Sequence, residues 1–213
     1  MANYLTQQIN RFLAPDWSVL DLCCGNGLVS DGFTCRSITG VDIYRPYLDQ
    51  YLARVNNASV LERNLATIMR NSVDIAPQSY DVVICADGVE HLEPEPSTEL
   101  ISWMESIARH RVVIFTPLNV NNPGGIVLNT PHNAWGIEGG NNWQEHRCGY
   151  APEFFISRGY QAYSLHTHLN SYDGTPYTEM LYVKSSPIVA EARHGGSRPL
   201  CAFGSDAPAG VGP

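Results

Sequence analysis

The chain has 213 residues, of which 44% are hydrophobic and 16% are charged, and its formal net charge is −8. This composition excludes a disordered chain and suits one globular domain with a sizeable core. The balance of 13 basic and 21 acidic residues disfavours a protein that binds nucleic acid through the phosphates.

The amino-terminal residues 1–8 are polar and lack the apolar core of a secretory signal. No apolar run is long enough to span a bilayer, and the six cysteines show no CxxC spacing. We therefore expect a cytoplasmic protein without membrane association, whose thiols are reduced and mostly buried.

Apolar patterns that alternate between helix and strand periods run through most of the chain. The predicted helices cover residues 3–13, 28–33, 46–55, 98–109 and 152–158. The first predicted strand ends near Cys23. The other predicted strands cover residues 37–43, 59–62, 80–86, 111–115, 160–165 and 177–183. This alternation predicts an α/β fold: a Rossmann-like doubly wound sheet, mostly parallel, with helices on both faces and a C-terminal antiparallel hairpin.

Residues 1–186 are expected to form one domain. Within it, residues 118–150 are rich in Asn, Gly and Pro and exceed a normal connection, so they are a candidate substrate-side insertion or lid loop. From residue 187 to residue 213 the composition shifts to Gly, Pro, Ala and Ser, which predicts a flexible tail.

The most informative stretch is residues 19–27, where a short apolar run stops at a glycine turn. Gly25 and Gly27 permit positive φ and a close approach of another molecule to the backbone. A strand followed by such a turn and a helix forms a nucleotide-binding crevice in an open α/β sheet.

The next predicted strand contributes a carboxylate beside this turn. It ends in Gly40-Val41-Asp42, where an acid can accept hydrogen bonds from two ribose hydroxyls, in NAD or in any other adenosine-containing ligand. Two features of the sequence distinguish an NAD site from a site for another adenosine-containing ligand. Ser30 stands where a dinucleotide fingerprint has its third glycine, and the strand at 80–86 is followed by the polar run Asp87-Gly88-Val89-Glu90-His91-Leu92.

Together these runs resemble the motifs of class I S-adenosylmethionine-dependent methyltransferases. Residues 19–27 resemble motif I, residues 40–42 the ribose-binding acid, residues 80–92 the fourth-strand motif that closes in Glu-His-Leu, and residues 112–117 the fifth strand. The resemblance covers roughly residues 16–117 and implies S-adenosyl-L-methionine as cofactor, with S-adenosyl-L-homocysteine as product. Two departures are Cys23, where the family usually has glycine, and Asn64, where many relatives have an aspartate that contacts adenine.

The resemblance also implies roles for individual residues. Backbone groups near Gly25 and Gly27 would hold the methionine part, Asp42 the ribose, and Asp87 the amino group or the sulfonium side. Asn64 and the backbone of Leu65 would hold the adenine, since an amide oxygen can accept the same hydrogen bond. The full set of expected cofactor-binding residues is Asp21, Cys23, Gly25, Asn26, Gly27, Asp42, Ile43, Asn64, Leu65, Asp87 and Gly88. Of these, Asp21 is expected mainly to order the glycine turn.

A methyltransferase holds its acceptor in line with the S–CH3 bond, and the acceptor must also lose a proton. His91 and His146 are the candidate catalytic bases, because an imidazole with a pKa near 6.5 suits proton removal at neutral pH. The structural alternatives are that His91 orders the loop at a helix start and that His146 is a surface residue.

No metal is expected. His166 and His168 lie on one face of a predicted strand, but no third ligand is obvious from the sequence. A divalent-ion site would alternatively use the acidic run after residue 86, with the ligands Asp87, Glu90, His91 and Glu93.

The acceptor is expected to be a small molecule with an oxygen or nitrogen nucleophile, such as a sugar or a natural-product intermediate. Trp135, Trp143 and Asn119 are candidate substrate-binding residues, although the tryptophans could simply pack the long loop. We expect a monomer or a homodimer. The alternatives are a catalytically silent partner subunit with the same fold and an NAD-dependent oxidoreductase, which the missing third glycine disfavours.

Overall fold

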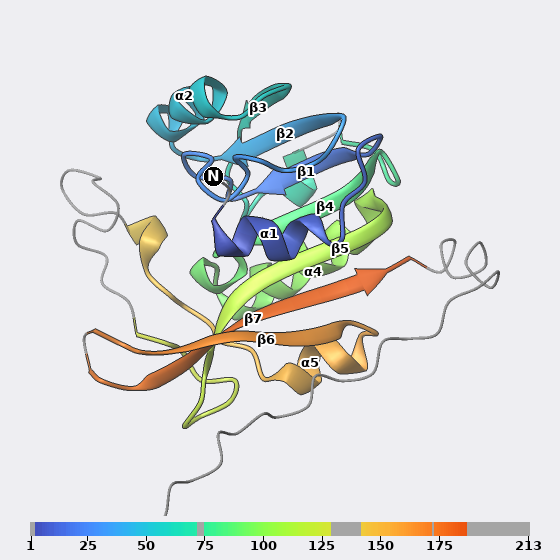
Figure 1. The fold of residues 1–213 in the computed structure, drawn as a ribbon. Helices are drawn as coiled ribbons and strands as arrows, with labels where there is room; N and C mark the ends of the chain where they lie inside the picture. Colours follow the sequence, from blue (N-terminus) through green and yellow to red (C-terminus); the bar gives the residue numbers. More distant parts are fainter. Residues whose placement is uncertain (1–2, 72–74, 129–141, 172, 187–213) are drawn as a thin grey trace, which may run out of the picture.

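A seven-stranded sheet forms the centre of the protein (Figure 1). The computed structural model describes residues 3–71, 75–128, 142–171 and 173–186. The spatial order of the strands is β3-β2-β1-β4-β5-β7-β6. Their bounds are β1 Ser18–Leu22, β2 Ser37–Asp42, β3 Ala58–Glu62, β4 Tyr80–Ala86, β5 Ala108–Asn119, β6 Gln161–Leu169 and β7 Pro176–Ser185. Strands β1 to β5 are parallel, whereas β7 runs antiparallel to both β5 and β6.

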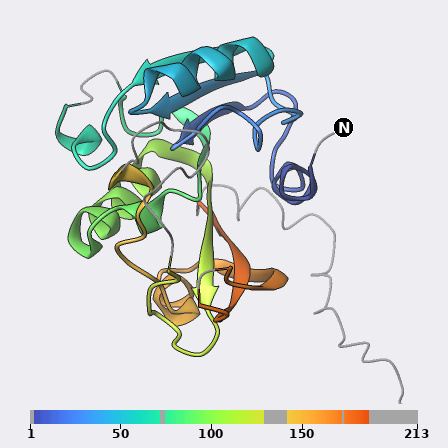
Figure 2. The ribbon, with the colours of Figure 1, turned by 90° about the vertical axis from the view of Figure 1, so that its left-hand side faces the viewer.

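Helices cover both faces of this sheet, which confirms the predicted doubly wound fold. The helical elements are α1 Tyr4–Asn10, α2 Arg45–Arg54, α3 Ile68–Asn71, η1 Val89–His91, α4 Pro94–Ile107, η3 Asn142–Gln144 and α5 Pro152–Ser157. Helices α1 and α2 pack in one apolar cluster, and α3, α4 and α5 pack in the other. Figure 2 shows α1 (dark blue) and α4 (green) on opposite sides of the sheet.

The central strand β4 supplies side chains to both clusters. Val82 and Ile84 face the α2 side, while Val83 and Cys85 face the α4 side, and all four are fully buried. This follows from the two-residue period of a strand and explains why residues 82–86 of β4 are all apolar rather than alternating.

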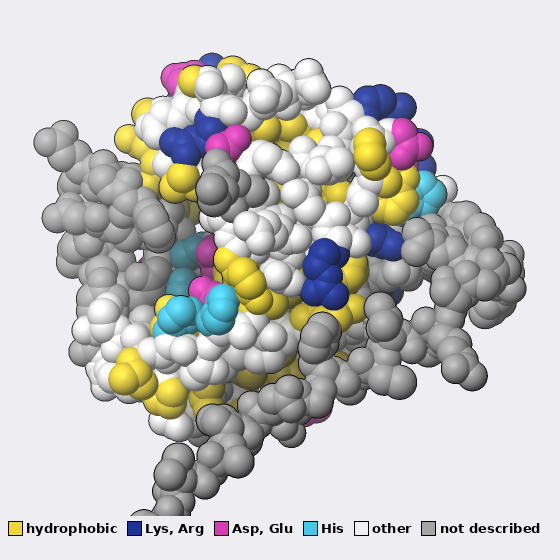
Figure 3. Space-filling model, viewed as in Figure 1, with side chains coloured by type: hydrophobic (Ala, Val, Ile, Leu, Met, Phe, Trp, Pro, Cys, Tyr) yellow, Lys and Arg dark blue, Asp and Glu magenta, His cyan; other side chains and the backbone are white. Residues whose placement is uncertain are grey.

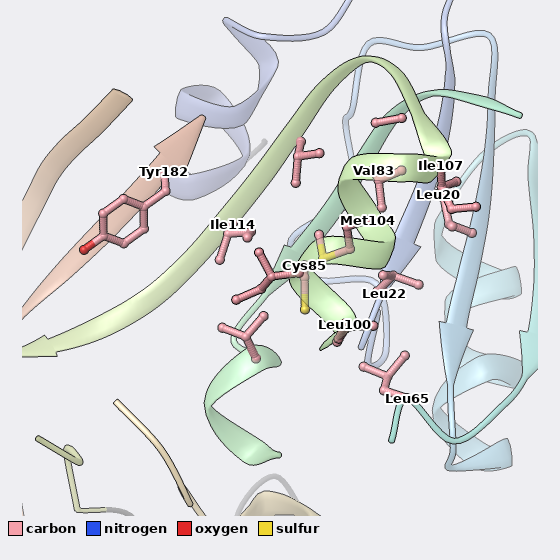
Figure 4. Packing of buried hydrophobic residues seen from close by; sticks show 14 of the residues in the cluster. Leu20, Leu22, Leu65, Val83, Cys85, Leu100, Met104, Ile107, Ile114 and Tyr182 are labelled. Atoms are coloured by element: carbon pink, nitrogen blue, oxygen red, sulfur yellow. The ribbon is translucent and has the colours of Figure 1, made fainter. Parts of the chain in front are cut away.

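Helix α4 presents Leu100, Met104 and Ile107 to the sheet, close to Val83 and Leu20 (Figure 4). The helix begins at Pro94, four residues before the predicted start. Proline is tolerated in the first turn of a helix because its missing N–H would have no intrahelical acceptor there. Each of these buried side chains contributes roughly 1.5–3 kcal/mol of hydrophobic stabilisation.

The helix predicted at residues 28–33 is wrong, because this segment forms consecutive turns. Gly27 and Gly32, which flank the segment, have positive φ of 81° and 92°, a conformation that a right-handed helix does not contain.

Helix α1 covers this turn segment instead. The side chains of Asn3, Thr6 and Asn10 donate hydrogen bonds of 2.9, 2.6 and 2.9 Å to the carbonyls of Leu28, Val29 and Gly32. These carbonyls would otherwise lack the partners that a crossover helix provides. The amino-terminal helix therefore fixes the segment that follows the glycine turn.

Several sequence-based expectations concern residues beyond these elements. The predicted tail at 187–213 and Trp135 lie outside the described residues. The described cysteines are free thiols, as expected, and Cys24, Cys85 and Cys148 are buried. None of the described helices combines the length and apolar character needed to cross a membrane.

Candidate active site

A cavity of about 780 Å³ opens at the carboxyl ends of the parallel strands. Residues at or just after the carboxyl ends of β1, β2 and β4 line it, including Gly25, Asp42 and Asp87. Strand order reverses between β1 and β4, and open α/β sheets bind ligands in the crevice at such a switch point. The volume lies within the range of about 300–1,000 Å³ that is typical of small-molecule sites.

The glycine turn and the end of β2 are joined through Asp42. Its Oδ2 accepts a 3.0 Å hydrogen bond from the Gly25 amide, and its Oδ1 accepts a 2.9 Å bond from the Tyr44 amide. The Cys24 amide also donates to the Val41 carbonyl at 3.1 Å. Asp42 is 7% exposed, and burial raises its pKa. Two fixed amides therefore hold this carboxylate at the wall of the cavity.

Positive φ angles shape the turn, at Cys23 (56°) and at Gly25 (51°). No atom lies within 4 Å of the place where a Cβ would stand at Gly25, so its backbone is open to approach. Gly88 differs, because a Cβ there would lie 2.5 Å from Cys85 Sγ and 2.7 Å from Cys23 Cβ. The tight packing beneath the turn therefore requires a residue without a side chain at position 88. Gly88 does not line the cavity.

Asp21 lies behind the glycine turn and does not line the cavity. Ser30 Oγ and Tyr51 OH both donate to its Oδ2, the latter at 3.0 Å. Burial raises the pKa of Asp21 to about 6. This geometry supports the expected role in ordering the turn rather than in touching a ligand.

His91 and His146, 55 positions apart in the chain, both line the cavity with ring centroids 4.9 Å apart. Backbone bonds bring them together. The amides of Arg147 and Cys148 donate to the Glu90 carbonyl at 2.7 and 3.2 Å, which ties the segment carrying His146 to η1. The sequence proposed both histidines separately but gave no sign of their proximity.

Each histidine uses Nδ1 toward a backbone carbonyl: His91 toward Glu145 at 3.3 Å and His146 toward Val127 at 2.7 Å. A carbonyl only accepts, so Nδ1 carries the proton and Nε2 keeps a lone pair in the neutral ring. Burial, with a smaller contribution from His91, lowers the pKa of His146 to about 4, and burial lowers that of His91. Both imidazoles are therefore neutral at pH 7.

Glu90 lies beside this pair. It is 1% exposed, and neither carboxyl oxygen has a hydrogen-bond partner among the described residues. Burial raises its pKa. The ligand atoms of Glu90, His91 and His146 lie within 4.8 Å of one another, a set that could share a proton or hold a metal ion. Glu93, which the sequence had grouped with them, is instead 64% exposed and lies 3.6 Å from Arg147.

The cavity brings together part of the predicted site. Its lining includes these predicted residues: Cys23, Gly25, Asn26, Asp42, Asp87, His91 and His146. Outside the lining are Asp21, Gly27, Ile43, Asn64, Leu65, Gly88, Asn119 and Trp143. Asn64 accepts a 2.9 Å bond from the Ala66 amide, and Leu65 packs in the apolar core. Adenine binding by Asn64 and Leu65, and acceptor binding by Trp143 and Asn119, stay predictions.

Several lining residues were not singled out in the sequence. They include Tyr47 of α2, Val127, Gln144, Asn170, and Tyr177 and Glu179 of β7. Tyr177 and Glu179 are two positions apart on one strand, so they share a face. Their place in the cavity wall can be recognised only once the strand register is known.

Residues 19–110 match a family model described as a methyltransferase domain. This range contains the glycine turn, Asp42 and the run from Asp87 to Leu92. A ubiquinone biosynthesis O-methyltransferase of Photobacterium profundum is 25% identical over 122 residues, which cover 56% of this chain and 50% of the relative. The chain thus spans about half the length of the curated relatives it matches.

Solved structures share the fold. A SAM-dependent methyltransferase of Methanosarcina mazei superposes with a TM-score of 0.59 at 12% identity, over 87% of this chain and 99% of that chain. Magnesium protoporphyrin IX methyltransferase of Synechocystis, solved with bound S-adenosylmethionine, gives a TM-score of 0.50 at 17% identity, over 87% and 86% of the two chains. Residues 19–110 thus match a methyltransferase domain, and the sheet topology is that of the fold shared by these solved methyltransferases.

Proposed function

We propose that this protein transfers a methyl group from S-adenosyl-L-methionine to an oxygen or nitrogen nucleophile of a small molecule. The observation that carries this proposal is that the glycine turn, Asp42 and the His91–His146 pair line one cavity. A cofactor-binding turn and neutral bases in the same space are what methyl transfer to a protonated nucleophile requires.

The residues present fit the cofactor. The open backbone at Gly25 allows close approach, and Leu28 and Val29 add apolar surface to the same wall. A carboxylate can accept about four hydrogen bonds, and Asp42 accepts two from the backbone amides of Gly25 and Tyr44. It therefore keeps acceptor capacity for the ribose hydroxyls, and Asp87 lines the wall where the methionine amino group would lie. When bound, the cofactor supplies a methyl group already activated on a sulfonium centre.

One of the two histidines would take the acceptor's proton. His146 is the stronger candidate, because Val127 fixes its Nδ1–H and leaves Nε2 as the basic atom. His91 then serves as its neighbour in the wall, at 4.9 Å between ring centroids. Most of the remaining acceleration would come from holding the nucleophile at about 3–3.5 Å from the methyl group.

Residues 118–150 would select the acceptor. Val127, Gln144 and His146 from this segment line the cavity. Trp135, Trp143 and Asn119 stay candidates for acceptor contacts. The matched relatives are named as O-methyltransferases, which favours oxygen as the first acceptor atom to test.

Calorimetric titration with S-adenosyl-L-homocysteine tests the cofactor assignment, and transfer from methyl-labelled cofactor to a panel of phenols, sugars and amines tests the reaction. We expect micromolar or tighter binding and label transfer to at least one acceptor. Absence of binding would contradict the proposal, and NAD binding in its place would favour an oxidoreductase. Binding without transfer to any acceptor class would point to a silent partner subunit.

A further inference from the structure

The β6–β7 hairpin carries a second histidine cluster, separate from the His91–His146 pair. In the register of the hairpin His168 pairs with Tyr177 and Ser164 pairs with Met180, with a register shift between Ser164 and Thr167. His166 lies within this shift, where residues 165 and 166 together stand against Glu179. His166 and His168 share a strand face, so the fold brings Glu179 to both as the third ligand that the sequence alone did not reveal.

The distances within this cluster suit a shared ion. Glu179 Oε2 lies 3.6 Å from His166 Nδ1, and Oε1 lies 3.3 Å from His168 Nε2. The ligand atoms of all three residues lie within 4.8 Å of one another. Two ligands bound at about 2.1 Å to one tetrahedral ion are about 3.4 Å apart, so only small side-chain movements are needed.

The cluster is accessible and its rings are supported. The side chains of His166, His168 and Glu179 are 51%, 45% and 28% exposed, so an ion can reach them without opening the core. The Tyr4 ring lies 4.3 Å from that of His166, and Tyr177 lies 5.4 Å from His168. Figure 3 shows histidine side chains gathered beside acidic ones at a hollow on this face. Among the described residues, no Lys or Arg forms an ion pair with Glu179.

We propose that His166, His168 and Glu179 bind a divalent transition-metal ion of the zinc class. Two imidazoles with one carboxylate suit Zn²⁺, Co²⁺ or Ni²⁺, whereas Mg²⁺ and Ca²⁺ prefer oxygen ligands. Three protein ligands leave at least one coordination position open. This proposal departs from the expectation, drawn from the sequence, that the protein uses no metal.

Glu179 also lines the cavity that holds Asp42 and His146, so the ion would lie at its rim. Resting on the proposed methyl transfer, we assign the open position to an anionic oxygen of the acceptor, such as a carboxylate or a phenolate. The ion would thereby orient the acceptor from the hairpin side of the cavity.

The test is calorimetric titration of the metal-free full chain with ZnCl₂, repeated with CoCl₂ while the visible absorption of cobalt is recorded. We expect one saturable equivalent per chain and no binding of MgCl₂. H168A and E179Q should weaken binding at least about tenfold, since even outer-shell partners of a metal contribute that much. Both positions are partly exposed, and circular dichroism checks that the variants fold.

The matched control is H146A, which removes a ligand from the Glu90–His91–His146 group instead. Zinc binding that survives in H168A and E179Q but disappears in H146A would overturn the proposal, as would the absence of a saturable equivalent. Unchanged zinc affinity in all three variants would also overturn it. Binding of S-adenosyl-L-homocysteine is measured on the same samples without metal. If the wild-type protein does not bind S-adenosyl-L-homocysteine, the proposed methyl transfer is contradicted, whereas the zinc titration tests the metal site independently.

Discussion

The backbone N–H of Gly25 donates a 3.0 Å hydrogen bond to Oδ2 of Asp42, which joins the turn after β1 to the end of β2. The acid therefore has two places in the structure: it accepts a hydrogen bond that orders the glycine turn, and it lines the cavity. A substitution at Asp42 consequently affects the shape of the site as well as its chemistry.

Replacing Asp42 with Ala should weaken S-adenosyl-L-homocysteine binding by about 10–100-fold. Hydrogen bonds to a charged group contribute roughly 1.5–3 kcal/mol, and the Gly25 and Tyr44 amides also lose their acceptor. Calorimetry measures the affinity, and thermal unfolding separates it from loss of fold. D42N is the matched control, because one amide oxygen remains as an acceptor and an intermediate affinity is expected. An unchanged affinity in D42A would remove the ribose assignment.

Asp21 should matter for stability more than for binding. In D21A the buried Ser30 and Tyr51 hydroxyls lose their acceptor, at about 1–3 kcal/mol each, whereas the amide oxygen in D21N can still accept both bonds. We expect D21N to bind S-adenosyl-L-homocysteine within a few-fold of the wild type, since Asp21 does not line the cavity. A large loss of affinity in D21N with a normal unfolding curve would show direct contact instead.

The pH dependence of stability gives Asp21 a second signature. Its pKa is about 6 in the folded protein and 3.8 in the reference state, so the folded state binds more protons between these values. The contribution of Asp21 to stability therefore improves as pH falls from about 6 to 4 and is lost as pH rises through 6. Urea unfolding measures the free energy of unfolding at pH 7 and at pH 5. The gain in this free energy from pH 7 to pH 5 should be smaller for D21N than for the wild type.

Gly25 and Gly88 should respond in opposite ways to alanine. G88A forces a Cβ to within 2.5 Å of Cys85 Sγ, so we expect a marked loss of stability. G25A meets no neighbouring atom and costs about 1–2 kcal/mol for its left-handed backbone, but its methyl group stands where a ligand would approach. Denaturant unfolding and S-adenosyl-L-homocysteine titration of both variants check this. Equal effects on binding and stability in the two variants would contradict it.

His146 should act as a base that stays neutral over the working pH range. Its pKa of about 4 predicts that turnover falls only below about pH 5, rather than near the usual histidine value of 6.5. H146Q should lower kcat by about 10²–10⁴-fold while leaving the affinity for S-adenosyl-L-homocysteine nearly unchanged. H110Q is the control, because His110 lies beside Asp81 and does not line the cavity. A full effect in H91Q and none in H146Q would reassign the base to His91.

Elements with strong local signals could be predicted from the amino-acid sequence alone. β4 falls at residues 80–86 as predicted, because it contains the continuous apolar run from Val82 to Ala86, which is typical of a strand buried on both faces. Gly25, Asp42 and Asp87 were placed correctly at one edge, since parallel strands bring their carboxyl ends together. The failed helix at 28–33 shows the limit of such patterns: two left-handed glycines and the covering helix α1 overrode the local preference.

Which distant side chains come into contact became known from the three-dimensional fold. His146 joins His91 because amides of the following residues bond to the Glu90 carbonyl, and Glu179 reaches His166 because of the register of the β6–β7 hairpin. Composition and periodicity report on neighbours within a few residues, whereas these contacts depend on loop closure and strand register across the whole sheet. The chemistry of the two histidine clusters therefore became visible only with the fold.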